Sequence, residues 1–114
     1  MDWFKDSLYK QLELQENAKG VCCCNDLPNV KDMYGAATGM IIEIGEMLQC
    51  DTRWKREITM SKKEPYYNKE QFLEECADVF IYFMNVLIYG DIRLDEFKRK
   101  VLEKQEIVKE RFNA

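Results

Sequence analysis

Two pairs of acidic residues stand in stretches of the sequence that are otherwise strongly apolar. Glu43 and Glu46 lie within MIIEIGEML, and Glu75 and Asp78 lie within FLEECADVFIYFMNVLIY. The members of each pair are three residues apart, so they share one face if the stretch is helical. A carboxylate that leaves water without a partner is costly, or it keeps its proton with a raised pKa. We therefore expect the two pairs to face each other and to converge on cations.

The donor atoms in these pairs favour a hard divalent cation. Four carboxylates with no His or Cys among them suit Mg²⁺, or Mn²⁺ in its place, and do not suit zinc. The chain contains no histidine, which excludes a Ser-His or Cys-His catalytic pair. Acid–base chemistry then rests on carboxylates, lysine, tyrosine or metal-bound water. The alternative is that both pairs lie on solvated edges of a helical bundle.

The length and charge of the chain limit the classes of function. A chain of 114 residues is the size of one domain, which we place at residues 1–114. The net charge of −4 disfavours a nucleic-acid partner, since such proteins usually carry a basic excess. No uncharged run approaches the ~20 residues that span a membrane, and Asp2 and Lys5 interrupt the start where a signal peptide would be apolar. We expect a cytoplasmic protein with no membrane partner.

The five cysteines form no framework that the sequence explains. Their number is odd, no two of them have C-x-x-C spacing, and they stand at Cys22, Cys23, Cys24, Cys50 and Cys76. Three adjacent thiols do not comfortably reach one tetrahedral ion, so reduced thiols are favoured over a zinc site. We have no physical account of the run CCC beyond a tolerated loop.

Helices are the elements that must position the acidic pairs. Hydrophobic periodicity predicts four of them, at about 3–17, 30–50, 68–89 and 94–112. Asn29 and Asn68 are predicted N-caps of the second and third helices, the latter in a capping box with Gln71. No segment has the pattern of a strand, so we predict an all-α four-helix bundle with the third helix as its most buried element. The fourth helix carries an apolar stripe of Leu94, Phe97, Val101, Val108 and Phe112.

The polar stripe on the third helix extends beyond its two acids. At about 100° per residue, Tyr82 and Asn85 fall in the same sector as Glu75 and Asp78. This stripe lengthens the polar surface that the glutamates of the second helix can face.

The order of these motifs resembles that of the all-α NTP pyrophosphohydrolases, the superfamily that includes MazG-like enzymes, dimeric dUTPases and dCTP pyrophosphatases. The resemblance covers about residues 35–112 and rests on E-x-x-E in EIGE, a basic loop, E-x-x-D in ECAD and Asn85, seven residues further on. Ile42 stands where the fuller signature E-E-x-x-E often has its first glutamate. The gap between Glu46 and Glu75 is also long for the family.

This resemblance implies a Mg²⁺-dependent hydrolase that acts on phosphoanhydride bonds. It would cleave a (d)NTP to the nucleoside monophosphate and pyrophosphate by attack of water on the α-phosphorus. The implied metal ligands and catalytic residues are Glu43, Glu46, Glu75 and Asp78. One of the glutamates would also orient or deprotonate the water. The resemblance further implies that Asn85 bonds to the nucleotide or supports the metal ligands, and that Lys104 and Arg111 contact phosphates.

The triphosphate would need cations besides the metal, and the loop between the motifs offers several. They are Arg53, Lys55, Arg56, Lys62 and Lys63, of which the first two are favoured. The alternative for each is an ordinary solvated surface charge. In the same loop, Trp54 would stack on a base or is an interface aromatic. Tyr82 would bound the sugar.

A glycine inside a helix lowers the stability of that helix by about 1 kcal/mol relative to alanine, so the glycines of the second helix should have a role that offsets this loss. Gly35 and Gly39 lie on the face of the glutamates. Their gain is either close helix packing or space for a nucleoside against the backbone. We expect Gly45 to serve packing on the opposite side.

The size of the core suggests that the chain does not act alone. The third helix is apolar on more sides than three neighbours would cover, so we predict a homodimer or homotetramer, which the family resemblance also implies. Two readings without catalysis stay open. The chain can be a silent relative that binds a nucleotide, or a helical interaction protein whose acidic stripes are surface.

Overall fold

A computed structural model describes residues 2–19, 27–51, 53 and 67–113. These residues form four helices, α1 (Trp3–Lys19), α2 (Val30–Gln49), α4 (Lys69–Tyr89) and α5 (Leu94–Asn113). The described ranges contain no strand and only one isolated antiparallel bridge, between Asp51 and Tyr67. The predicted all-helical fold is therefore confirmed, and each predicted helix end lies within two residues of the observed one.

The two predicted N-caps are confirmed. The side chain of Asn29 accepts a hydrogen bond of 3.0 Å from the backbone N–H of Asp32. Asn68 accepts one of 3.1 Å from the backbone N–H of Gln71. Each bond satisfies a backbone donor that the first helical turn leaves without a partner, so each asparagine sets where its helix begins.

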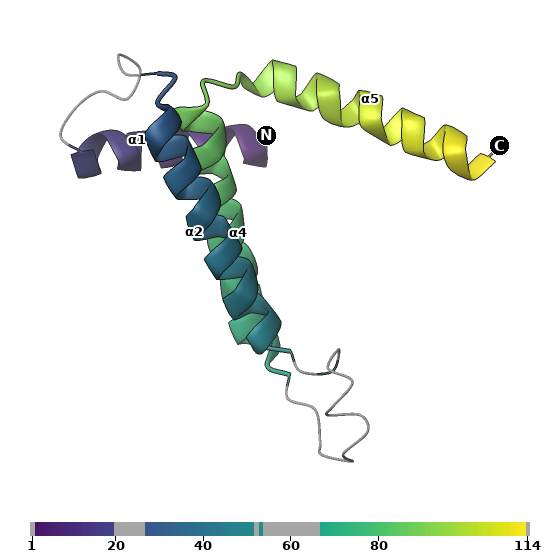
Figure 1. The fold of residues 1–114 in the computed structure, drawn as a ribbon, viewed down its shortest axis with the longest axis horizontal. Coiled ribbons are helices and arrows are strands. Elements are labelled where there is room, and N and C mark those ends of the chain that lie inside the picture. Colours follow the sequence, from purple (N-terminus) through teal and green to yellow (C-terminus); the bar gives the residue numbers. More distant parts are fainter. Residues whose placement is uncertain (1, 20–26, 52, 54–66, 114) are drawn as a thin grey trace.

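Helices α2 and α4 form a long antiparallel hairpin, side by side along most of their length (Figure 1). The register follows from contacts at three levels, which pair Gly90 with Met33, Tyr82 with Gly39, and Cys76 with Met47. Most of the buried residues in the described chain lie near the C-terminal end of α4: Met84, Asn85, Leu87, Ile88 and Tyr89. The prediction that this helix is the most buried element is confirmed.

Helix α1 crosses the hairpin near the start of α2 and the end of α4 (Figure 1). Trp3 stacks on Phe80 of α4 with ring centroids 5.4 Å apart. Phe4 meets the same ring edge-on at 5.3 Å. Phe4 begins the row Phe4, Leu8 and Leu12, whose spacing of four residues is that of one apolar helical face.

Helix α5 leaves this core and projects away from the hairpin (Figure 1). Phe97 packs on Phe83 at 5.4 Å between ring centroids, and Lys98 pairs with Asp2 at 2.5 Å. Beyond that point its apolar stripe is uncovered among the described residues, and Phe112 is 85% exposed. None of the helices that the structure describes is long and apolar enough to cross a membrane.

Candidate functional site

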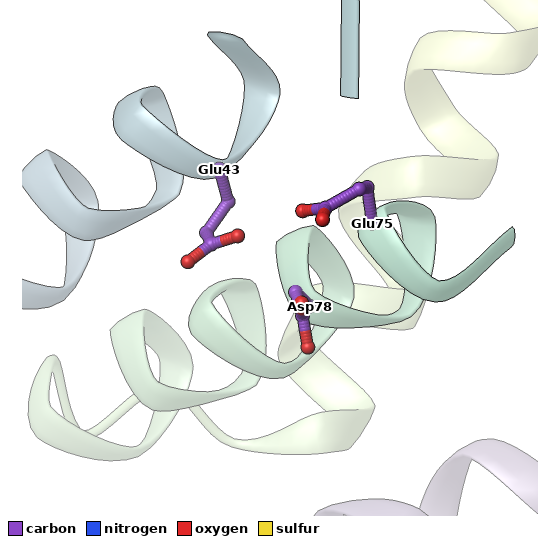
Figure 2. A group of neighbouring side chains, drawn as sticks. All are labelled: Glu43, Glu75 and Asp78. Carbon is purple, nitrogen blue, oxygen red and sulfur yellow. The ribbon is translucent and has the colours of Figure 1, made fainter. Parts of the chain in front are cut away.

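Three acidic side chains from α2 and α4 come together in the hairpin. Glu43 lies on α2, and Glu75 and Asp78 lie one turn apart on α4. One carboxylate oxygen of each lies within 4.8 Å of the others. Figure 2 shows the carboxyl groups of Glu43 and Glu75 turned toward each other across the gap between the helices. The expected convergence of the two acidic pairs is thus present for three of the four residues.

Two oxygen atoms in this cluster are buried without a partner. The Oε2 atoms of Glu43 and Glu75 are shielded from solvent, and when both groups are ionised no described donor reaches either atom. Because a desolvated carboxylate oxygen needs a proton or a cation, this pair fits a site for a positive ion. The donor set is all oxygen, which suits Mg²⁺ or Mn²⁺.

The pKa values of two acids in the cluster, Glu43 and Glu75, are raised. Loss of hydration, followed by repulsion from Glu46, raises the pKa of Glu43 from 4.5 to about 7. Loss of hydration also raises the pKa of Glu75, although hydrogen bonding with Glu43 opposes the change. A divalent ion would replace these protons and relieve the same repulsion.

Glu46 lies at the edge of the group formed by the other three acids. It is exposed, and it is not part of the group whose oxygen atoms lie within 4.8 Å of one another. It is nevertheless close enough to Glu43 to raise the pKa of that group. Glu46 therefore lies at the edge of the cluster, within interaction distance of both Glu43 and Glu75.

Tyr82 lies one helical turn beyond Asp78 on α4, where it faces α2. Its ring packs against Gly39, where a Cβ atom would lie 2.8 Å from Cδ1. Gly35 has nothing within 4 Å of an added Cβ among the described residues, and it lines a cavity of about 480 Å³ between α1, α2 and α4. Gly39 therefore serves close packing and Gly35 leaves space. The expectation for Gly45 is wrong, because an added Cβ there would meet none of the described atoms.

Asn85 lines this cavity and not the acidic cluster. Its side chain is buried, and Oδ1 accepts a hydrogen bond of 2.9 Å from Nε2 of Gln11. Gln15 lies beside it and accepts a hydrogen bond from the Tyr89 hydroxyl. Neither glutamine was predicted as a site residue from the sequence. The signal was available, because positions 4, 8, 11 and 15 follow the spacing of one helical face.

Of the basic loop residues that were predicted to contact phosphates, the structure describes Arg53. The guanidinium of Arg53 donates two hydrogen bonds to Asp51, at 2.8 and 2.7 Å, and lies 3.8 Å from the centroid of the Tyr67 ring. It is therefore engaged within its own loop. The remaining loop candidates lie outside the described residues: Trp54, Lys55, Arg56, Lys62 and Lys63, and so do Cys22, Cys23 and Cys24.

Lys104 and Arg111 are on the projecting part of α5. Both are exposed, and the helix carries them away from the hairpin that holds the acidic cluster (Figure 1). One copy of the chain in this arrangement does not bring the two cations to the acids.

Comparisons with known proteins leave the family of the chain open. No family model, curated protein or solved structure matches it. A functional conclusion therefore rests on the acidic cluster, on the cavity beside it and on the motifs that link them.

Proposed function

We propose that the chain is a Mg²⁺-dependent nucleoside triphosphate pyrophosphohydrolase of the all-α, MazG-like superfamily, which converts a (d)NTP to the monophosphate and pyrophosphate. The observation that carries the proposal is the pair of buried, unpartnered oxygen atoms of Glu43 and Glu75 beside Asp78. A cavity large enough for a nucleoside lies next to them along the same hairpin.

Each acid has a role in this proposal. Glu43, Glu75 and Asp78 hold the cation, and Glu46 at the rim orients the attacking water and accepts its proton. A divalent ion, when bound, supplies charge neutralisation for the phosphates and activates the water. The water oxygen bonds to the α-phosphorus, the bond from that phosphorus to the bridging oxygen breaks, and pyrophosphate leaves with that oxygen. No histidine is needed.

A second copy of the chain is part of the proposal. No residue of α5 is buried, and its apolar side chains from Val101 to Phe112 are exposed. We propose that a homodimer or homotetramer covers this surface. The partner's α5 then brings Lys104 and Arg111 to the phosphates, which the same chain's α5 does not do. The proposed oligomer would also explain why a small core tolerates an uncovered helix.

Product analysis tests the function. A panel of standard and modified (d)NTPs with Mg²⁺ should show release of pyrophosphate and a monophosphate from at least one member. Glu46→Gln and Asp78→Asn should each abolish the release, and Glu74→Gln, an exposed neighbour on α4, should not. Inorganic phosphate and a diphosphate as products would contradict the mechanism.

The exposed apolar residues of α5 favour one other function, a helical interaction protein. In that case the acidic cluster is only a feature of the hairpin. Mg²⁺ would then produce no thermal shift, and Asp78→Asn would leave stability unchanged or improve it. A silent nucleotide-binding relative would instead bind a (d)NTP and release no pyrophosphate.

A further inference from the structure

A buried pair of amide side chains lines the cavity beside the acidic cluster. Gln11 of α1 is 7% exposed and Asn85 of α4 is 8% exposed. They are joined by a hydrogen bond of 2.9 Å from Nε2 of Gln11 to Oδ1 of Asn85. They are the buried polar residues of the described chain, and both face the same space of about 480 Å³.

The hydrogen-bonding capacity of this pair is only partly used. Within the described part of the chain, the bond between them is the one that their side chains make. An amide has an NH₂ group and a C=O group. Whichever way round the pair is bonded, one NH₂ and one C=O are left for another molecule. A buried donor and acceptor that stay unused cost free energy, so a complementary ligand edge would be favoured.

The order of groups along the hairpin matches the order of parts in a nucleotide. The acidic cluster comes first, the ring of Tyr82 on Gly39 comes next, and the amide pair follows. From Asp78 to Asn85 the helix rises by roughly 10 Å, which is the scale of one nucleotide. Phosphates held at the acids would therefore place the sugar beside Tyr82 and the base in the cavity.

We propose that Gln11 and Asn85 act together as the residues that recognise the nucleobase. A base presents adjacent donors and acceptors along its edge, and the unused C=O and NH₂ of the two amides together can pair with two of them. In the observed bonding, Gln11 keeps its C=O and Asn85 keeps its NH₂ for a ligand. This order of acceptor and donor separates bases with an amino edge (adenine, cytosine) from those with a keto edge (guanine, thymine, uracil). The inference rests on the proposed function for the position of the phosphates.

Binding of products by calorimetry tests this role. The probes are dAMP, dCMP, dGMP and dTMP, with 2-deoxyribose 5-phosphate as the compound that lacks a base, all with Mg²⁺. The wild type should favour one edge class by about 10-fold or more, the discrimination expected of paired hydrogen bonds to a base. Gln11→Met, which keeps the length of the side chain, should bring all four nucleotides close to the sugar phosphate. Glu13→Met, at an exposed position on the same helix as Gln11, should preserve the ranking.

A second variant keeps the test decisive if Gln11→Met does not fold. Gln11→Glu can still accept a hydrogen bond from Asn85, but it then leaves only acceptors facing the cavity. The preference should shift toward bases with an amino edge. An unchanged ranking in a folded variant, or equal loss of affinity for every probe including the sugar phosphate, would overturn the role in recognition.

Pyrophosphate release from the matching triphosphates, measured on the same samples, separates the two proposals. If the order of affinities for the four nucleotides depends on Gln11 and no pyrophosphate is released, the proposed enzyme is refuted and the recognition site stands. If pyrophosphate is released and the order of affinities does not change when Gln11 is replaced, the recognition site alone is refuted. A wild type that binds none of the nucleotides more tightly than the sugar phosphate would also refute it.

Discussion

The ring of Tyr82 occupies the space that a side chain at Gly39 would fill. A Cβ atom on Gly39 would lie 2.8 Å from Cδ1 of Tyr82 and nearer still to Cε1. Helices α2 and α4 therefore approach each other closely at this level, between the acidic cluster and the cavity. The glycine is required by the neighbouring ring, since its own backbone is helical.

Alanine at Gly39 should lower the free energy of unfolding, and alanine at Gly45 should raise it. Gly39→Ala forces the ring of Tyr82 to move, which we expect to cost about 1–3 kcal/mol. Gly45→Ala meets no described atom and should gain about 0.5–1 kcal/mol from helix propensity. Urea denaturation of both variants measures the difference. Equal effects of the two substitutions would mean that the ring is not held against Gly39.

The metal-free protein should lose stability as the pH rises from about 4.5 to about 7. The pKa of Glu43 is raised from 4.5 to about 7 in the folded chain. The folded state therefore holds more protons than the unfolded state in this window, and the free energy of unfolding falls as they are lost. Below the window both states are protonated, and above it the destabilisation is complete.

Thermal unfolding in a chelator across this window checks the sign. Glu43→Gln should flatten the dependence on pH and should be more stable than the wild type above pH ~7. Glu13→Gln, an exposed position on α1, is the matched control and should keep the wild-type slope. A slope that survives in Glu43→Gln would assign the proton to another group.

Addition of Mg²⁺ should reverse that loss of stability at neutral pH. A ligand that binds only the folded state stabilises it by about 2.7 kcal/mol at a hundred times its dissociation constant. The melting temperature of the wild type should therefore rise with the logarithm of Mg²⁺ concentration, and Asp78→Asn should abolish the rise. Glu74→Gln is the control. A wild type whose melting temperature ignores Mg²⁺ and Mn²⁺ would refute a metal role for the cluster.

Local signals in the sequence were enough to predict the helices and much of the site. Asn29 and Asn68 mark helix starts because a cap depends only on the next three residues. Glu43 and Asp78 could be placed toward each other because helical periodicity defines a face, and two apolar helices must bury theirs together. The same reasoning does not determine how far each helix is rotated. For this reason the position of Glu46 at the edge of the cluster was not predicted.

Features that depend on which helix surfaces pack against each other could not be predicted from the sequence. Gln11 lies on the same face of α1 as Phe4 and Leu8, but its burial depends on where that helix crosses the hairpin. The apolar stripe of α5 was predicted correctly, yet nothing in its periodicity says what should cover it. In the structure Phe97 packs against Phe83 and Phe112 is left exposed.

A charge on the uncovered stripe of α5 should reduce the size of the assembly. Light scattering should give a mass two or four times the 13.6 kDa of one chain for the wild type. Val108→Glu should weaken association by about 10-fold or more, because it would bury a carboxylate in an apolar contact. Lys109→Glu, at a polar position one residue away, changes the charge by more and should have less effect. A wild-type mass of 13.6 kDa would contradict the proposed oligomer.

Mixing two inactive variants should restore activity if α5 of one subunit completes the site of another. Asp78→Asn removes an acid from its own subunit, and Lys104→Ala removes a cation that acts in the partner. In a mixed dimer, the subunit with intact acids faces a partner with an intact Lys104, so one of its two sites works. Random reassociation of equal amounts should give about a quarter of the wild-type rate of pyrophosphate release, as two-fold symmetry requires. If Lys104 acts within its own chain, each mixed dimer has one site without the acid and one without the lysine, and no activity returns.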